Sequence, residues 1–182
     1  DSGSNVGKIR LQTSGGTGSV NFERTSVAYN DGQWHHLVAA YDCTSAGDNT
    51  FLYIDGLLIL DFNSNQWSSG TSTNDVHIGA NNTSGAESFK GQIDQFRVYN
   101  AVLTASQVTE LNNETATTAS TLNYPTGAGC LALYEFNDNA DDTGNNYDGT
   151  IANITYDSFL FKPDLVLIKN LTYSGGSSWS WA

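Results

Sequence analysis

The chain has 182 residues, 19 acidic and 7 basic, and its formal net charge is −12. Charged residues make up only 14% of the chain and aromatic residues 12%, so it has enough core material to fold. Seven scattered basic residues exclude the basic footprint of a nucleic-acid-binding protein and disfavour an anionic membrane surface. No apolar run approaches the roughly 20 residues of a membrane-spanning helix.

Short apolar or alternating segments recur with Gly, Asn, Ser and Asp between them, which is typical of β-strands. Two weak strands are predicted over 8–12 and 20–27, and a strong one over 34–41, expected to be buried on both faces. Asp55-Gly56 favours a type I′ hairpin turn, because both turn positions need positive φ. The flanking and following strands are predicted over 51–54, 57–62, 76–79 and, with alternation, 89–99.

One short helix is predicted after these strands. Thr104 and Gln107 fit a capping box, with Thr104 as the N-cap. Val108 and Leu111 then lie one turn apart and can face a core. Asn112-Asn113 is expected to end the helix. Later strands are predicted over 131–136, 149–156 and 165–169, before a Gly/Ser-rich tail that carries Trp179 and Trp181.

Many short strands with a single helix predict an all-β antiparallel sandwich or jelly roll. A segment rich in Thr, Ala, Ser and Gly, 114–129, is predicted to be a linker. Cys43 and Cys130 are expected to be free thiols, and a mutual disulfide is the alternative.

An ordered series of short motifs then suggests a family. Residues 30–38 read NDGQWHHLV, and LYIDG, VHIG and FKGQIDQFRVYN follow at 52–56, 76–79 and 89–100. Together they resemble the laminin-G-like members of the concanavalin A-like jelly rolls over residues 27–113. The resemblance implies a β-sandwich body at 1–113 and carbohydrate binding as its common use.

A second resemblance lies downstream. Residues 130–150, CLALYEFNDNADDTGNNYDGT, are similar to the opening of the same family, although here they follow its last strand. The segment 130–158 can fold back as a circular permutation, begin a truncated second repeat, or complete a neighbouring subunit by strand exchange. Either permutation or exchange alters how the sandwich is completed.

A third resemblance concerns the C-terminal unit, 159–182. Its residues 161–170, FKPDLVLIKN, resemble a segment that recurs in virion proteins of marine tailed bacteriophages, including fibre proteins. This resemblance implies a virion surface or extracellular location.

Catalysis is not expected. Jelly-roll hydrolases of the laminarinase type place several carboxylates at alternate positions of one strand, about 5 Å apart for a retaining mechanism. Here Asp94 is alone, between Gln92 and Phe96 on the same face. His35 and His36 have no accompanying nucleophile motif. The chain is therefore predicted not to be an enzyme.

A structural calcium ion is a candidate cofactor. Residues 137–148 supply many carboxylate and amide oxygens, although they do not follow the EF-hand spacing. In the family such an ion joins the opening loop to the Ile-Asp strand, so the resemblance implies Asp94 and Asp141 as ligands, with Thr143 as a further one. The alternative is a solvated loop of Asx turns without metal.

A glycan site is predicted on the loops. Sugars pack on an exposed aromatic plane and hydrogen-bond to polar loop groups. Trp67 lies in a polar loop, and Asn81, Asn82 and Glu87 can supply polar contacts. In the alternative, Trp67 caps an open end of the sandwich. Trp34 and Tyr53 are expected in the core.

These observations predict a non-catalytic adhesion module that binds a cell-surface glycan. The alternative is a structural building block of a viral fibre, decoration or shell. In that case strand or tail exchange joins the chain to copies of itself or to other virion proteins.

Overall fold

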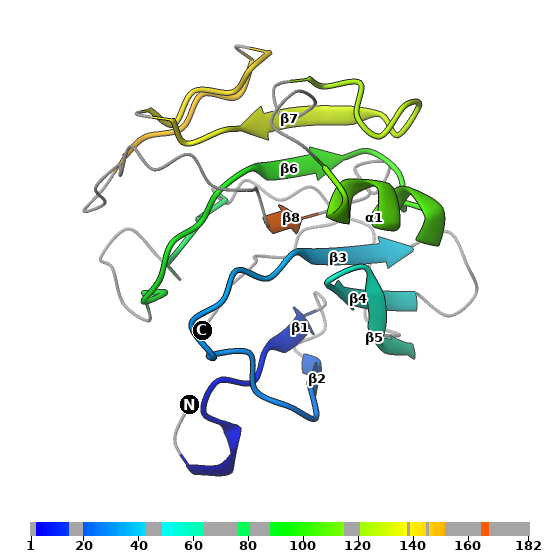
Figure 1. Cartoon of the computed structure of the whole chain (residues 1–182), viewed down its shortest axis with the longest axis vertical. Coiled ribbons are helices and arrows are strands. Elements are labelled where there is room, and N and C mark those ends of the chain that lie inside the picture. The colour runs from blue at the N-terminus through cyan, green and yellow to red at the C-terminus, as the bar shows by residue number, and fades with distance from the viewer. Residues whose placement is uncertain are drawn as a thin grey trace.

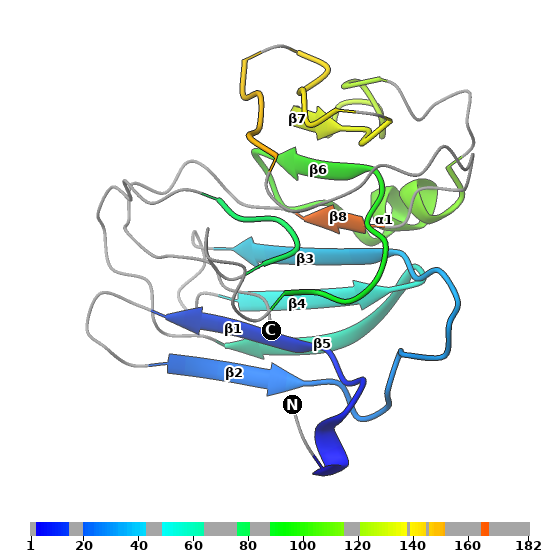
Figure 2. The same cartoon turned by 90° about the vertical axis from the view of Figure 1, so that its left-hand side faces the viewer.

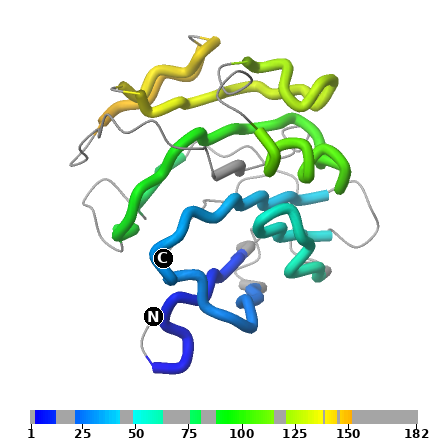
Figure 3. Tube along the Cα trace, viewed as in Figure 1, coloured from blue at the N-terminus to red at the C-terminus, as the bar shows by residue number. Residues whose placement is uncertain are grey.

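The computed structural model describes residues 3–14, 20–42, 49–63, 76–80, 88–114, 121–137, 139–144, 146–151 and 165–167 (Figure 1). In chain order the elements are η1 (Gly3–Asn5), β1 (Arg10–Ser14), β2 (Val20–Arg24), β3 (Leu37–Asp42), β4 (Asn49–Ile54), β5 (Leu57–Asn63), β6 (Phe96–Tyr99), α1 (Ala105–Asn112), β7 (Cys130–Tyr134) and β8 (Leu165–Leu167). The N-terminal residues around η1 (dark blue) lie at one end of the molecule and the region of β7 (yellow) at the other (Figure 3). Within these residues no helix has the length and apolar character needed to cross a bilayer.

A four-stranded sheet in the order β5-β4-β3-β8 forms the middle of the molecule (Figure 2). β3, β4 and β5 are antiparallel, whereas β8 pairs with β3 in parallel, Leu37 opposite Leu165. Asp55 and Gly56 join β4 to β5 with φ of 52° and 79°. The predicted hairpin is confirmed, because a type I′ turn needs positive φ at both positions.

Side chains of β3 alternate between two hydrophobic clusters, one on each face of this sheet. Val38 and Ala40 belong to the first cluster, and Ala39 and Tyr41 to the second. The first is completed by β6, α1 and neighbouring segments, with Tyr99, Leu103, Val108, Leu111 and Ala128 buried in it. The second contains Leu11, Leu52 and Ile54. The expectation of a strand buried on both faces is confirmed for 38–41.

The segment that resembles a family opening pairs within its own chain. β7 lies antiparallel to β6, with Phe96 opposite Tyr134 and Tyr99 opposite Cys130. How this segment completes the sandwich, by permutation, by a second repeat or by exchange, stays a prediction. Tyr124 and Ala128, from the predicted linker, pack against the first cluster and connect β7 to it.

Helix α1 begins and ends where its sequence signals lie. The Thr104 hydroxyl accepts a hydrogen bond from the Gln107 amide at 3.2 Å, and the Gln107 side chain accepts one from the Thr104 amide at 2.9 Å. This reciprocal capping box satisfies two backbone donors that a helix start leaves free. Val108 and Leu111 are buried, and Asn113 is the C-cap. The helix prediction is confirmed in each of these details.

Two strand predictions are wrong. The long strand over 89–99 is reduced to β6, because Gln95 has φ of 53° and so interrupts extended backbone directly before Phe96. Residues 76–79 form no strand; Gly79 has φ of 81°, and its carbonyl accepts a hydrogen bond from the Phe89 amide at 2.8 Å. Of the predicted strand 149–156, residues 149–151 are not in a strand and the rest lie outside the described residues.

A buried ion pair lies beside the first cluster. Arg97 is fully buried and Glu114 is 4% exposed. The Arg97 guanidinium donates from Nη1 to Glu114 Oε2 at 3.0 Å and from Nη2 to Glu114 Oε1 at 2.6 Å. Burial raises the pKa of Glu114 even against the opposing charge and hydrogen bonds of Arg97. The pair therefore ties β6 to the end of the α1 segment at a cost in desolvation.

Cys130 carries a free thiol. Its Sγ donates to the Ala132 carbonyl at 3.3 Å, and burial raises the pKa of the thiol to about 11. Such a thiol stays protonated at neutral pH and is a poor nucleophile. Cys43, its predicted alternative partner, lies outside the described residues.

Candidate functional site

The loop that leads into β3 meets the β4–β5 turn through a histidine held between two carboxylates. His35 Nδ1 lies 2.9 Å from Asp55 Oδ2, and His35 Nε2 lies 3.1 Å from Asp31 Oδ1. The Tyr29 ring and the imidazole pack edge to face, with 5.2 Å between centroids. We call these three residues, Asp31, His35 and Asp55, the histidine clasp.

Backbone bonds reinforce the clasp. Asp55 Oδ1 accepts from the His36 amide at 3.0 Å, and the Asp55 amide donates to the His36 carbonyl at 2.8 Å. Asp31 Oδ1 also accepts from the Gln33 amide at 2.9 Å. Asp55 therefore forms part of the β4–β5 turn and also hydrogen-bonds to the imidazole and to the backbone of the loop. These bonds hold the loop 30–36 at a defined position.

The clasp favours the charged imidazolium. Burial alone lowers the pKa of His35, but the hydrogen bonds and charges of Asp55 and Asp31 outweigh it and raise that pKa. The Gln33 amide and then His35 lower the pKa of Asp31. With both ring nitrogens facing carboxylates, His35 is suited to position a loop and is not free to take a proton from a substrate.

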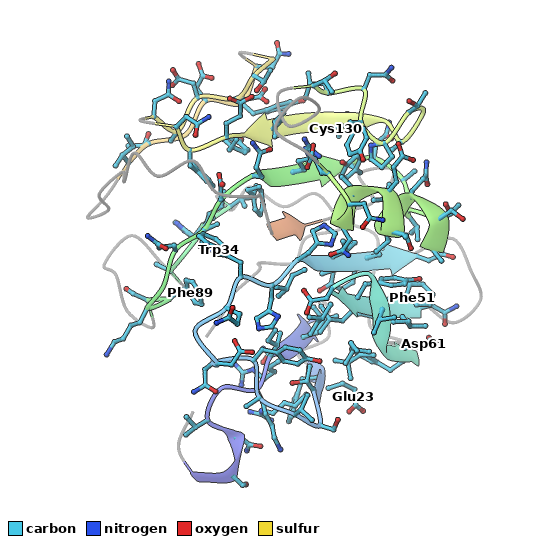
Figure 4. The ribbon with its side chains drawn as sticks, viewed as in Figure 1. Glu23, Trp34, Phe51, Asp61, Phe89 and Cys130 are labelled. Carbon is cyan, nitrogen blue, oxygen red and sulfur yellow. The ribbon has the colours of Figure 1, made fainter. Side chains whose placement is uncertain are left out.

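Trp34 differs from the sequence expectation. It was predicted in the core, but it lies on the loop before β3 and is 37% exposed (Figure 4). The strand begins at Leu37, so alternation starts three residues later than the sequence predicted. Tyr53, the other predicted core residue, packs partly buried against the first cluster. The clasp thus holds a loop that presents an aromatic ring to solvent.

The predicted glycan-binding residues lie outside the described part of the chain. These are Trp67, Asn81, Asn82 and Glu87, and Trp179 and Trp181 of the tail lie outside it as well. Their roles stay predictions.

In the acidic loop after β7, Asp142 has the most extensive contacts of the described residues. Asp142 is 1% exposed, and its Oδ1 accepts from the Leu133 amide at 2.8 Å. The Thr143 amide donates to the Leu133 carbonyl at 2.9 Å, and the Asp142 amide donates to Asp148 Oδ1 at 3.1 Å. Asp141, the predicted calcium ligand, is exposed, and its amide donates to Asn139 Oδ1 at 3.2 Å. The loop contains the Asx turns of the metal-free alternative, although these do not exclude a metal.

The other predicted calcium ligand lies at the start of the β6–β7 pair. Asp94 is partly buried; burial raises the pKa of this carboxyl, and the charge of Glu135 raises it further. Across the described residues no group of three or more His, Cys, Asp and Glu side chains comes together as a metal cluster. A calcium ion here would therefore need backbone, amide or hydroxyl oxygens as well.

Sequence reasoning missed the clasp and Asp142. Asp55-Gly56 was recognised as a turn, but nothing local indicated that its carboxylate reaches His35, 20 residues away. Asp31-Gly32 carries a similar turn signal, with Gly32 at φ of 79°. One sequence signal points to the histidine clasp: an Asp followed by a Gly, shortly before a Trp-His pair.

The comparisons with known proteins give one match. A family model described as the concanavalin A-like lectin/glucanases superfamily, Laminin_G_3, matches residues 2–109. No curated protein and no solved structure matched the chain.

Proposed function

Because the chain belongs to the concanavalin A-like lectin/glucanase superfamily, we propose that it is a non-catalytic carbohydrate-binding module of an extracellular or virion surface protein. Its partner is a cell-surface glycan. Membership supports a carbohydrate-binding type of module, and the superfamily also includes glucanases. The observation that carries the proposal is the exposed Trp34 on a polar loop held by the histidine clasp, since sugars pack their C–H faces on such rings.

The absence of catalysis is part of this proposal. Asp94 lies before β6 and outside any strand, and Gln92 and Phe96, two residues to either side of it, carry no carboxylate. Glu135, the acidic group whose charge acts on Asp94, comes from the end of a different strand. That is unlike the row of carboxylates on one strand that jelly-roll hydrolases of the laminarinase type use for retaining hydrolysis.

The test of glycan binding uses Trp34→Ala and Trp67→Ala, with Tyr147→Ala as a matched control. Tyr147 is 57% exposed and lies outside the proposed site. On a glycan array we expect a hit for the wild type and the control, and loss of that hit in at least one Trp variant with an unchanged melting temperature. An aromatic platform typically contributes about 1 kcal/mol or more, so affinity should fall at least several-fold. Unchanged binding in both Trp variants would remove these residues from the site.

A structural calcium ion at Asp94, Asp141 and Thr143 belongs to the same proposal. The mutual charge of Asp94 and Glu135 favours a nearby cation. We expect calcium to raise the melting temperature of the wild type and of Asp61→Asn, an exposed control on β5, and to raise that of Asp94→Asn much less. A melting temperature that excess chelator and added calcium leave unmoved would contradict calcium binding.

β8 favours a second candidate function, the structural building block. β8 pairs with β3 far from it in sequence, and it also lies against β6. A neighbouring copy could donate such a strand. Light scattering across a dilution series distinguishes the candidates: a constant mass near 19.6 kDa favours the binding module, and a defined oligomer or a polymer favours the building block.

A further inference from the structure

The β1–β2 hairpin gathers basic and aromatic side chains on one face. Its register places Arg10 opposite Arg24 and Gln12 opposite Phe22. Residues two apart on a strand share a face, so these four side chains point the same way. Ile9 and Leu11 alternate with Arg10 and pack in the second cluster. The four residues therefore lie on the face turned away from that cluster, and we call them the arginine face.

The arginine face is unexpected on a chain with net charge −12. Like charges directly opposite each other on antiparallel strands destabilise the pair, because their β-carbons are only about 5 Å apart. Glu23 (labelled in Figure 4) is opposite Leu11, so alternation places it on the other face of the hairpin. Arg97, the remaining arginine, pairs with Glu114 in the buried ion pair. The guanidinium groups of both Arg10 and Arg24 would attract an anion at the arginine face.

Phe22 adds an apolar plane beside the two charges. The ring is 48% exposed, and the guanidinium carbon of Arg24 lies 4.8 Å from its centroid. The cation–π contact positions Arg24 over the ring. Arg24 also makes at least one other interaction, which a ligand would join or replace. Two guanidinium groups, an amide and an exposed ring thus lie on one small surface.

We propose that the arginine face binds an acidic saccharide, with the carboxylate of a uronic acid residue between Arg10 and Arg24. The C–H face of the sugar packs on Phe22, and the Gln12 amide hydrogen-bonds to a hydroxyl. Guanidinium groups suit carboxylates because their donors match the two oxygens. A short acidic saccharide suits this chain better than a long polyanion, which the surrounding negative charge repels.

This inference rests on the proposed carbohydrate-binding function only for the class of ligand. The site itself is separate, because Trp34 and Trp67 are not part of it. The probe is tri-galacturonate, and its methyl ester serves as the same sugar without the charge. Variants are Arg10→Gln, Arg24→Gln and Phe22→Ala, with Lys90→Gln as a control that removes one exposed positive charge elsewhere. Titration calorimetry measures affinity, and melting curves verify the fold of each variant.

We expect each arginine variant to lose about tenfold or more in affinity for tri-galacturonate, since one charge-assisted hydrogen bond contributes about that much. Phe22→Ala should lose several-fold, and Lys90→Gln and Trp34→Ala should bind as the wild type does. The methyl ester should bind at least tenfold more weakly.

Several results would overturn the proposal: no binding of tri-galacturonate by the wild type, equal loss in Lys90→Gln, or equal binding of the ester. If sulfate competes as well as the trisaccharide and Phe22→Ala has no effect, the face binds simple anions and the saccharide assignment is wrong. Should an arginine variant fail to fold, chemical-shift changes of the wild-type Arg10 and Arg24 side chains on titration decide the matter. Loss of array binding in Trp67→Ala with tri-galacturonate binding intact would separate this site from the proposed one.

Discussion

The buried pair of Arg97 and Glu114 and the histidine clasp are both charged clusters, but the pKa of Glu114 is raised in the first and the pKa of Asp31 is lowered in the second. Arg97 and Glu114 meet with two short hydrogen bonds, and yet burial still raises the pKa of Glu114. In the clasp, where Asp31 is largely exposed, the Gln33 amide and then His35 lower the pKa of Asp31 although its slight burial raises it. The comparison teaches that burial opposes the charge of a carboxyl in both clusters, and that hydrogen bonds outweigh burial for the exposed Asp31 but not for the buried Glu114.

The largest effect is expected from breaking the buried pair. Glu114→Gln leaves the Arg97 guanidinium without its counter-charge, which typically costs about 3–5 kcal/mol of unfolding free energy. Glu110→Gln is the matched control, because Glu110 lies exposed on α1. Urea unfolding of both variants provides the measurement, and a Glu114→Gln loss no greater than that of the control would contradict this view.

The double variant Arg97→Met with Glu114→Leu sharpens the same point. Removing both charges avoids the uncompensated cation, so much of the stability lost in Glu114→Gln should return. A double variant as unstable as Glu114→Gln alone would indicate that the pair stabilises the fold by its own attraction.

A smaller effect is expected at Asp55. Asp55→Ala loses the acceptor for the His36 amide and the partner of His35, and it places alanine at positive φ; the expected cost is about 2 kcal/mol. Asp55→Asn keeps an acceptor and tolerates the same φ, so it should lose roughly half as much. Equal losses in the two variants would mean that the carboxylate charge decides the effect.

The pH dependence of the clasp gives a smaller signal. The raised pKa of His35 means that its contribution is complete below its unfolded pKa near ~6.5 and is lost as pH rises through the folded value. His35→Gln should therefore cost under about 1 kcal/mol at pH ~6 and less at alkaline pH. Thermal melts of both proteins from pH ~5 to ~9 test this, and parallel profiles would contradict it.

The smallest effect is expected at Asp31. Its pKa is lowered, so its contribution is present above the unfolded value near ~3.9 and is lost as pH falls through the folded value. Asp31→Asn should thus lower the melting temperature slightly at neutral and alkaline pH, and the difference from the wild type should vanish as pH falls through the folded pKa of Asp31. A difference that also disappears as pH rises through the folded pKa of His35 would show that Asp31 acts only through His35.

Local sequence signals predicted the local structure well. The Asp55-Gly56 hairpin and the Thr104 capping box each depend on residues within one turn of each other, and both are confirmed. The strand over 89–99 was wrong because alternation does not reveal the positive φ of Gln95. The family resemblance supplied the sandwich class, which the family match now supports.

The charged clusters could not be predicted, because tertiary contacts bring their members together. Glu114 reaches Arg97 from 17 residues away, and Asp55 reaches His35 from 20. In the acidic loop the sequence offers Asp141 and Asp142 as equals, and only the pairing of β7 with that loop buries Asp142. The basic residues looked scattered along the chain, and the register of the hairpin places Arg10 beside Arg24.

The bonds at Leu133 have a consequence for how the molecule avoids unwanted association. A strand whose amides and carbonyls are open at a sheet margin can recruit another chain and start aggregation. At Leu133 the Asp142 side chain takes the amide and the Thr143 amide takes the carbonyl, so both groups are already occupied. Asp142 thus protects this strand from pairing with another molecule. Asp142→Ala would free the Leu133 amide, which a strand of another chain could then bind in a cross-β assembly.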